Sequence, residues 1–559
     1  MAPVLAPALA GVLALAAYLV TLSPSISWAD GASDSGELAA AAYVLGVPHP
    51  TTYPLYMILG WAVSHLPLGE PAYDLNLFSA LCGALTVSLV VAVAAVLPGR
   101  PIALIGQRVG AGTDDGSHRL RCLPLFGLVI GGCFLAAVPA FWVQATSTET
   151  RTLAAALVAI VLMILVCHCK TRSRRLLLAG WVIEGVALTD HLLCLAALPA
   201  LAAVTLTYPL PCNGNVQKRV LARVRLVLTA AAMLLPGLML YVYVPLRAAA
   251  GPWLNWGDAR TLRRFVWMVT GAQYRPLMQL NPGDLPGQFS DRAQALAGGL
   301  GPIALLAGCV GLALLWRRRP HPALVLLLTL VTALAQSSLY GAAAAPDYLI
   351  PAEMVLAVGA AYLLSALLEA CARRPDGWAK RRGVHLPWPI GGVAVVMTAM
   401  IGLSQQVSWQ RATSAQQDSR MARDYALVSL LGLPRHALIL AGGDEQTFAL
   451  WYAQFALGIR PDLAVVNTDL LAWQWYATAV RRHYPQLRWN GVPWPNADQD
   501  LDVDPARSAA RATAREAALI RANVNRVPIF WTAPDGVDDG YCGIEVQGNL
   551  FRCYPLGQA

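Results

Sequence analysis

Two carboxylates near the N-terminus are spaced so that they could act together in proton transfer. Asp34 and Glu37 lie three residues apart at the start of SGELAAAAYVLG, a run with the composition of a short helix. Residues at i and i+3 share a helix face, so the two acids could face one site. A carboxylate kept near a lipid interface is costly to ionise and its pKa tends to rise, which suits a general base acting on a hydroxyl. The same spacing also fits a helix start capped by Ser35 and decorated with acids.

The two acids belong to a long segment, residues 23–74, that contains no lysine or arginine. Aromatic and polar residues alternate along it, and Trp28, His49 and Tyr53 are candidates to contact a substrate. The run HPTTYPLY interrupts the helix with two prolines, and the apolar stretch Leu55–Leu66 is too short to span a bilayer easily. We therefore expect this segment to lie at the membrane interface or to re-enter the membrane.

The remainder of the chain has the composition of a polytopic membrane protein. Of its 559 residues, 57% are hydrophobic and 13% are charged, whereas a soluble domain carries about 25% charged residues. A helix needs ~20 apolar residues to cross the hydrocarbon layer. The segment 176–207 is interrupted by Thr189, Asp190 and His191, so we expect two short helices there and eleven crossings in all. The other nine runs lie near 3–22, 75–97, 123–143, 152–168, 226–245, 298–316, 322–340, 351–370 and 388–405.

The positions of lysine and arginine predict the orientation in the cytoplasmic membrane. Cytoplasmic loops carry an excess of these residues. Five loops hold 4, 4, 4, 3 and 5 of them, namely 98–122, 169–175, 211–225, 317–321 and 371–387, whereas 23–74, 144–151 and 341–350 hold 0, 1 and 0. We therefore expect the N-terminus inside, as a retained helix without an Ala-x-Ala cleavage signature, and segment 23–74 and the C-terminal tail outside. The net charge of +9 is thus a topology signal, and nucleic acid is excluded as a partner.

The tail changes character and predicts a second domain. Three strand-like runs alternate with helical stretches, which is typical of a small parallel α/β domain, so we divide the chain into 1–405 and 406–559. The strands are expected at 437–441, 463–467 and 527–531, and the helices at 445–457, 470–483 and 505–524.

Cys542 and Cys553 flank a predicted hairpin and could form a disulfide outside the cell or remain two buried thiols. GGD at 442–444 is either a helix-capping turn or a ligand site at a strand end.

Polar residues at the outer ends of the predicted spans could complete a site. Arg247 ends the run YVYVPLR, where its guanidinium could bind a phosphate or could snorkel to lipid phosphates. His49 and His191 could hydrogen-bond a phosphate or could be structural. No metal site is predicted, although Asp34, Glu37 and His49 offer ligands that a divalent cation could use. Glu149 and Asp347 are expected to line a substrate cavity, and Asn255 and Trp256 could stack on a sugar or lie in the aromatic belt. Asn76 could line the same cavity or join helices by hydrogen bonds.

Several motifs, in order, resemble a known family. They run from DSGE, HPTTYPLY and NLFSA between Trp28 and Ser79, through TDHLLCLAALPA at 189–200, YVYVPLRA at 241–248, LNWGD at 254–258 and PDYLIPA at 346–352, to GGDEQTFALWY at 442–452 and RPDLAVVN at 460–467. Over most of residues 20–480 the chain is similar to a family of multi-pass membrane proteins, formerly of unknown function, that is related to protein O-mannosyltransferases. It departs from the family's pattern at HPTTYP, which bears on the local loop shape and not on the carboxylates.

The resemblance implies an α-helical GT-C type membrane fold and glycosyltransferase activity on the extracytoplasmic face. The implied donor is a sugar linked to polyprenyl phosphate, and the acceptor is a hydroxyl of a protein Ser/Thr or of a glycan. An acid of the first external loop acts as catalytic base in such enzymes, which here implies Asp34, with Glu37 as helper or alternative. The implied reaction is a single inverting displacement. Some of these enzymes use a divalent ion, and those of the O-mannosyl type do not.

Two other functions compete with this interpretation. A transporter or flippase for lipid-linked sugars would show inverted repeats and paired broken helices, but one broken segment, near 189–191, is evident in the sequence. An assembly scaffold whose tail binds partners is disfavoured by the concentration of polar residues in segment 23–74.

Overall fold

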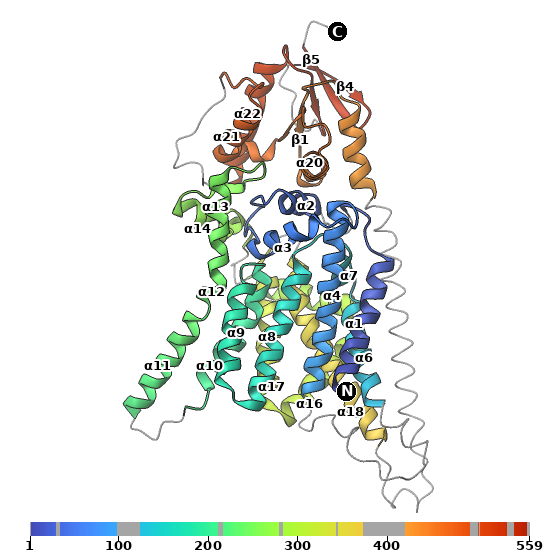
Figure 1. Ribbon diagram of the computed structural model, residues 1–559, viewed down its shortest axis with the longest axis vertical. Helices are drawn as coiled ribbons and strands as arrows, with labels where there is room; N and C mark the ends of the chain where they lie inside the picture. The colour runs from blue at the N-terminus through green and yellow to red at the C-terminus, as the bar shows by residue number, and fades with distance from the viewer. Residues whose placement is uncertain are drawn as a thin grey trace, which may run out of the picture.

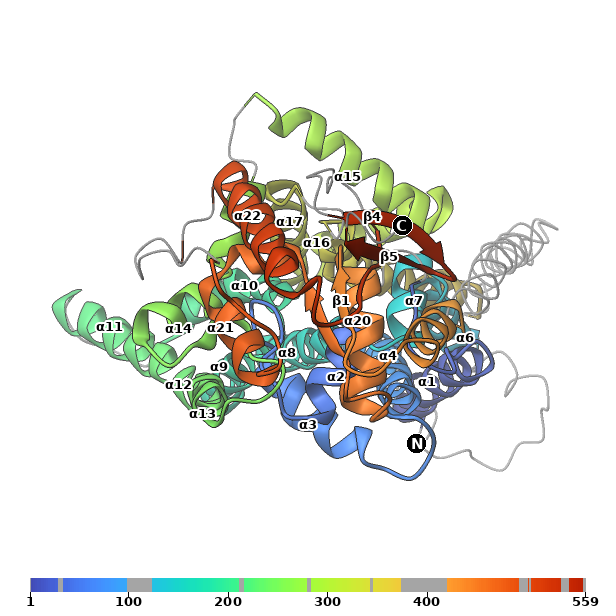
Figure 2. The ribbon, with the colours of Figure 1, turned by 90° about the horizontal axis from the view of Figure 1, so that it is seen from above.

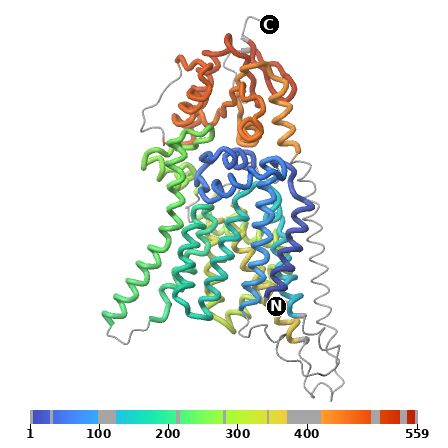
Figure 3. Tube along the Cα trace, in the orientation of Figure 1, coloured from blue at the N-terminus to red at the C-terminus, as the bar shows by residue number. Residues whose placement is uncertain are grey.

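The protein consists of a helical bundle covered at one end by a smaller unit of helices and strands (Figure 1). The computed structural model describes residues 2–28, 34–97, 123–210, 216–278, 283–341, 345–372, 420–491, 501, 504–533 and 542–555. The bundle helices run along the long axis, and the strands lie at the end opposite the start of α1 (Figures 1 and 3).

Within these ranges, five helical segments are long and apolar enough to cross a membrane, or seven if each of two bent pairs is one span. The five are α4 (Pro71–Val96), α8 (Arg151–Thr171), Val216–Ala250, α17 (Pro320–Leu339) and Ala345–Ala370, which includes most of α18 (Ile350–Ala372). The expected span at 388–405 lies outside the described residues, so the number of eleven crossings stays a prediction. Shorter helices complete the bundle, namely α1 (Ala2–Val20), α9 (Arg174–Ala187), η3 (Leu192–Ala197) and α10 (Leu198–Thr207).

The helix breaks follow from particular residues. The segment 176–207 is broken as predicted, since α9 ends at Ala187 and His191 Nδ1 accepts a hydrogen bond from the Leu193 amide, 3.0 Å away, to begin η3. The run at 123–143, predicted as one span, consists of α6 (Leu123–Ala136) and α7 (Pro139–Thr146), which meet at 75° and form either one broken span or a re-entrant loop. Pro139 has no N–H for the helical ladder and starts a new helix.

The segment between the predicted spans 226–245 and 298–316 also contains helices. It holds the end of α13 (Tyr243–Ala250), α14 (Leu262–Val269) and most of α15 (Leu285–Leu300), which bends by 106° into α16 (Pro302–Arg318). The segment that includes α11 (Val216–Ala232), α12 (Leu235–Leu238) and α13 runs along one side of the bundle, and α15 lies at its edge when viewed from above (Figures 1 and 2).

Close packing in the bundle depends on glycine. A Cβ added at Gly131 of α6 would lie 2.2 Å from the Ala361 Cα of α18, and one at Gly311 of α16 would lie 1.9 Å from the Gly359 carbonyl oxygen. Apolar side chains gain little from leaving lipid, so helices in membranes associate through such close backbone contacts.

Segment 34–64 forms a thin layer between the bundle and the C-terminal unit. It contains the short helices α2 (Ser35–Tyr43) and α3 (Pro54–Ser64), which lie across the bundle end (Figure 1). A Cβ at Gly36 would lie 2.6 Å from the Phe448 carbonyl oxygen, so α2 is pressed against the C-terminal unit. The prediction that Ser35 caps α2 is wrong. Its hydroxyl exchanges hydrogen bonds with the Ser27 amide and carbonyl, and Asp34 occupies the N-cap position.

The C-terminal unit is an α/β fold with a five-stranded sheet of order β2-β1-β3-β5-β4. The three predicted strands pair in parallel, and the predicted hairpin adds two antiparallel strands. Its elements are β1 (Leu438–Ala441), α20 (Asp444–Trp451), η8 (Tyr452–Ala456), β2 (Ala464–Asn467), η9 (Asp469–Ala472), α21 (Gln474–His483), α22 (Pro505–Asn523), β3 (Ile529–Trp531), β4 (Cys542–Gln547) and β5 (Leu550–Pro555). Cys553 is disulfide-bonded, and its pairing with Cys542 stays a prediction.

A polar cluster joins the C-terminal unit to the bundle. Arg423, on a helix over residues 420–431, donates to Glu70 Oε1 from Nε at 2.8 Å and from a terminal nitrogen at 2.6 Å. Ser25 donates to the same carboxylate at 2.9 Å. The Tyr452 hydroxyl accepts a hydrogen bond from the amide of Ala72, in the first turn of α4, at 3.3 Å.

We predict that Arg423→Ala loosens the contact between the two parts. The side chains of Arg423 and Glu70 are 35% and 28% exposed, so solvent screens the pair and we expect a loss of about 1 kcal/mol. Proteolytic cleavage that requires separation of the parts should become about fivefold faster. The matched control is Arg420→Ala, which removes an exposed arginine from the same helix. Equal cleavage rates for the two variants would contradict the prediction.

Candidate functional site

A cavity of about 670 Å³ lies where segment 34–64, the ends of the bundle helices and the C-terminal unit meet. Its wall combines carboxylates, cations and aromatic rings from all three parts of the molecule. The polar and aromatic side chains of this wall are Asp34, His49, Thr51, Tyr53, Arg151, His191, Trp256, Thr270, Gln273, Tyr274, Arg275, Gln336, Tyr340, Tyr348, Asp444, Phe448 and Trp473. Sequence analysis had named Asp34, His49, Tyr53, His191 and Trp256 as site residues, and the structure brings these five together.

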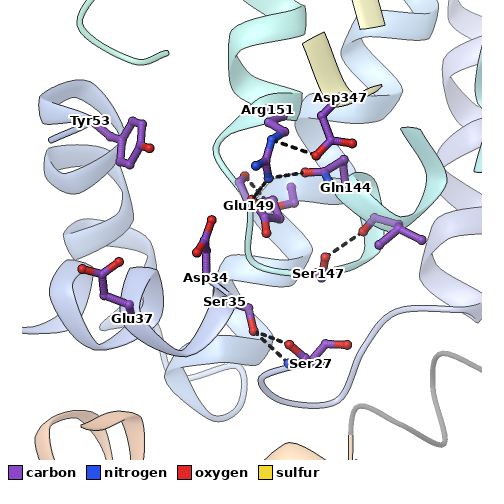
Figure 4. Close-up of polar contacts among 12 residues, drawn as sticks. Ser27, Asp34, Ser35, Glu37, Tyr53, Gln144, Ser147, Glu149, Arg151 and Asp347 are labelled. Atoms are coloured by element: carbon purple, nitrogen blue, oxygen red, sulfur yellow. Dashed lines mark hydrogen bonds and ion pairs between the residues drawn. The ribbon is translucent and has the colours of Figure 1, made fainter. Parts of the chain in front are cut away.

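The Asp34 carboxylate faces this cavity because it is not used to cap α2. Asp34 occupies the N-cap position with an αR backbone, and its side chain makes no capping hydrogen bond. The side chain is 28% exposed. Figure 4 shows the side chains of Asp34 and Glu37 leaving the start of the helix in different directions. The expected shared face is therefore not formed, since Asp34 lines the cavity and Glu37 does not.

Glu37 instead holds the loop that carries His49. Its fully buried carboxylate accepts a hydrogen bond from the His49 amide at 2.9 Å and makes a very short contact with His49 Nδ1. The opposite ring nitrogen, Nε2, lies 2.8 Å from the Tyr53 hydroxyl and 4.0 Å from Asp34 Oδ2. Burial alone would lower the pKa of His49, but the charges of Glu37 and Asp34 raise it to about 9. At neutral pH His49 is therefore an imidazolium between two carboxylates.

Arg151 forms the cationic part of the wall on the bundle side. It is the first residue of α8, and its side chain is 10% exposed. The guanidinium contacts Glu149 at 2.5 Å, Gln144 at 3.3 Å and Asp347 at 3.3 Å (Figure 4). Glu149 and Asp347, which we expected to line the cavity, thus act through Arg151, which they fix in position.

The C-terminal unit adds a second carboxylate opposite segment 34–64. Asp444 is the first residue of α20 and lines the cavity. Desolvation by the surrounding protein raises the pKa of Asp444 to about 6, with further contributions from the negative charges of Asp34 and Glu37, although the residue keeps contact with solvent. Asp444 is therefore close enough to the first two acids to sense their charge.

Aromatic rings form a continuous part of the wall. The ring of His191 stacks on Tyr53 at 5.8 Å between centroids and contacts Tyr348 at 5.4 Å. Tyr348 in turn contacts Tyr340 at 5.5 Å. A ligand with both polar and apolar faces could be held between these rings and the charged groups.

The structure does not bring Arg247 to this cavity. Arg247 Nε donates to the Leu45 carbonyl at 2.6 Å, and a terminal nitrogen lies 3.4 Å from the Val44 carbonyl. These carbonyls end α2, where a cation is favoured by the helix dipole. Arg247 thus stabilises the C-terminal end of α2 and is not part of the cavity wall.

Three further residues predicted for the site, Trp28, Asn76 and Asn255, also lie outside the cavity wall. Trp28 donates to the Glu445 carbonyl at 3.1 Å and packs at the junction of the two parts. Asn76 donates to the Ser23 and Ser25 carbonyls at 2.7 and 3.0 Å, so it ties α4 to the segment that follows α1. Asn255 is buried and lines a small aromatic pocket beside the cavity.

The sequence analysis missed several wall residues. They are Arg151, Tyr274, Arg275, Tyr340, Tyr348 and Trp473. A signal was available for Arg151, because it is the one basic residue of loop 144–151, on the side where such residues are rare. Arg275 and Tyr274 lie in η6 (Ala272–Leu277), inside a loop that sequence alone could not place.

Among the residues that the structure describes, no three His, Cys, Asp or Glu side chains are arranged to hold a metal ion. Asp34, Glu37 and His49 do not form such a set, because Glu37 is occupied by His49. We therefore derive no step through a divalent cation.

Comparison with known proteins agrees with this architecture. Residues 34–209 match the family profile described as "Protein O-mannosyl-transferase TMEM260 N-terminal domain", and residues 422–496 match "TMEM260-associated domain 2". The mouse protein O-mannosyl-transferase TMEM260 is 26% identical over 508 residues, which are 86% of this chain and 65% of the mouse protein. A Dictyostelium discoideum relative of the same name is 25% identical over 97 residues, or 17% of this chain and 12% of that protein. The chain thus spans less than two thirds of the length of these relatives.

Solved structures share the whole fold. ArnT from Cupriavidus metallidurans bound to undecaprenyl phosphate superposes with a TM-score of 0.54 at 15% identity, covering 99% of this chain and 98% of that one. Its apo structure gives 0.56 at 14% identity, over 98% and 97%. The chain is therefore an integral, multi-pass membrane protein with a GT-C type fold, and it is similar to the TMEM260 protein O-mannosyl-transferases, which confirms the resemblance noted in the sequence.

We predict a pH dependence of stability from His49. Its pKa is raised from 6.5 to about 9, so the stabilisation by its protonated form is complete below pH 6.5 and is lost as the pH rises through 9. The thermal unfolding midpoint of the wild type should fall between pH 7 and 10, and this fall should be smaller in His49→Gln. His321→Gln, at an exposed position, should behave like the wild type. An unchanged pH profile in His49→Gln would refute the assignment.

Proposed function

We propose that this chain is a membrane glycosyltransferase that moves a sugar from a polyprenyl-phosphate-linked donor to an extracytoplasmic hydroxyl. The observation that carries the proposal is the position of the Asp34 carboxylate. It makes no capping hydrogen bond to α2 and lies on the wall of a cavity that Arg151 and Arg275 also line. The relatives named as protein O-mannosyl-transferases point to mannose and to a protein Ser/Thr acceptor. A glycan hydroxyl would serve the same chemistry.

Asp34 is the proposed general base. It accepts the proton of the acceptor hydroxyl while that oxygen attacks the anomeric carbon of the donor. The bond from the anomeric carbon to the phosphate oxygen breaks as the new bond forms, and polyprenyl phosphate leaves with the electron pair. One displacement of this kind inverts the anomeric configuration. The imidazolium of His49, 4.0 Å from Asp34, helps to position the base.

The leaving phosphate requires fixed positive charge, and the wall offers it in two arginines. Arg151 lies at the start of a membrane-spanning helix, at the depth where a carrier lipid would place its phosphate. Arg275 is exposed on the wall of the same cavity. Guanidinium groups bind phosphate through paired hydrogen bonds, and these strengthen as charge develops on the leaving oxygen. We assign the phosphate to these residues and no longer to Arg247.

We also infer that the cavity faces the extracytoplasmic side. The support is the charge distribution in the sequence, since loops 98–122, 169–175, 211–225, 317–321 and 371–387 hold 20 lysine and arginine residues, whereas loops 23–74, 144–151 and 341–350 hold one. The N-terminus would then be cytoplasmic and the C-terminal unit extracytoplasmic.

A lipid-linked-sugar flippase is the second candidate, and the bent pairs α6–α7 and α15–α16 favour it, because broken helices are typical of transporters. Such transporters bind substrate near the bilayer midplane, whereas this cavity is lined by segment 34–64, ends of bundle helices and the C-terminal unit. Reconstituted vesicles distinguish the two functions, since a flippase would move the lipid-linked sugar without consuming an acceptor.

We predict that Asp34→Asn lowers the rate of sugar transfer by about 100-fold or more, because the amide cannot accept the acceptor proton. The measurement is transfer from a synthetic polyprenyl-phosphate-linked mannose to a Ser/Thr peptide by purified protein. Binding of the donor should be retained, and Glu545→Gln, an exposed carboxylate of β4 outside the cavity wall, should transfer at the wild-type rate. Normal transfer by Asp34→Asn would exclude it as the base.

We predict that Arg275→Gln weakens binding of the carrier phosphate. Loss of one charged hydrogen-bond donor should reduce the affinity for polyprenyl phosphate itself by about tenfold. Arg263→Gln, on α14 and outside the cavity wall, serves as the control. Equal affinities for the two variants would place the phosphate elsewhere.

A further inference from the structure

The carboxyl edge of the C-terminal sheet forms the roof of the cavity. Asp444 follows β1 and Trp473 follows β2, and these two parallel strands are neighbours in the sheet. The carboxyl ends of parallel strands lie on one edge, where open α/β sheets bind their ligands. Both residues line the cavity. The roof is therefore built from the position that such sheets use for recognition.

The loop that carries Asp444 is held rigidly by its neighbours. Gly443 has a φ of +75°, and its amide donates to Asp469 Oδ2 at 3.2 Å, while the Gly442 amide donates to Thr532 Oγ1 at 3.0 Å. Thr447 donates to the Gly443 carbonyl at 2.7 Å. These bonds fix the loop through residues that follow β2 and β3, and none of them uses the Asp444 carboxyl group.

Trp473 presents a partly exposed indole to the same space. Its ring packs against Trp267 at 5.4 Å between centroids and 61° between planes, so its orientation is fixed. The side chain is half-buried and forms part of the cavity wall. The roof thus offers a carboxylate and an aromatic ring, each held by neighbours outside the cavity.

The bundle side of the cavity determines the direction in which a bound donor would point. If the carrier chain stays in lipid and its phosphate lies at Arg151, the attached sugar extends from the membrane toward the roof. A pyranose carries adjacent hydroxyls, which donate to a carboxylate in pairs, and an apolar C–H face, which packs on an aromatic ring. Asp444 and Trp473 match these two features.

We propose that Asp444 and Trp473 form the subsite for the pyranosyl group of the lipid-linked donor. This inference rests on the proposed function and adds the residues that recognise the sugar. Asp444 accepts hydrogen bonds from two neighbouring hydroxyls, and Trp473 covers the apolar face of the ring. The C-terminal unit thereby selects the glycosylated carrier over the spent one, and Asp34 remains the base.

The experiment compares the binding of two lipids to the full chain in detergent. The probes are polyprenyl-phosphate-linked mannose and the same polyprenyl phosphate without sugar, each titrated against wild type, Asp444→Asn, Trp473→Ala and the control Glu445→Gln. Glu445 is the neighbouring carboxylate on α20 and is not part of the cavity wall. Turnover of Asp34→Asn is measured in parallel with the same donor.

We expect Asp444→Asn and Trp473→Ala to bind the mannosylated lipid about tenfold more weakly and to bind the sugar-free lipid within twofold of wild type. Glu445→Gln should match wild type for both lipids. The inference is overturned if both lipids are weakened equally, if neither is weakened, or if only the KM for the acceptor rises, which would place the acceptor at the roof. A normal rate in Asp34→Asn would instead overturn the proposed catalytic function, whatever the binding results.

Discussion

The candidate site depends on the contact between the buried carboxylate of Glu37 and the ring of His49. A carboxylate with no solvent access must be paired, and the imidazolium and amide of His49 satisfy it. This contact ties the loop after α2 to the helix itself and sets the direction of the opposite ring nitrogen. Tyr53 and Asp34 are then positioned around that nitrogen. The proposed base, Asp34, is thus supported by a second carboxylate, Glu37, that is fully buried.

Segment 34–64 can hold this arrangement because it is packed on both sides. Gly36 allows α2 to approach the backbone of Phe448 in the C-terminal unit, and Arg247 stabilises the other end of α2. The bundle below supplies Arg151, fixed by Glu149 and Asp347. Each part of the molecule therefore contributes a different chemical group to one cavity, and the contacts between the parts determine the geometry of the site.

The sequence predicted the elements better than their contacts. Apolar runs and alternating strands are local signals, so most bundle helices and all three parallel strands were found close to their true bounds. Asp34 was identified through a family resemblance, because spacing alone could not distinguish it from a helix cap. Neither the role of Glu37 nor the position of Arg247 could be predicted from the sequence. Both depend on which way a side chain points from a helix end, and that is decided by residues distant in the chain.

The central claim is that Asp34 faces the reacting carbon of a lipid-linked sugar. The most direct measurement is an experimental structure of Asp34→Asn with polyprenyl-phosphate-linked mannose bound. Our account predicts the phosphate within hydrogen-bonding distance of Arg151 or Arg275, and the anomeric carbon within about 6 Å of side chain 34, with room for one hydroxyl between them. A phosphate bound at the opposite end of the bundle, or a sugar turned away from side chain 34, would contradict it.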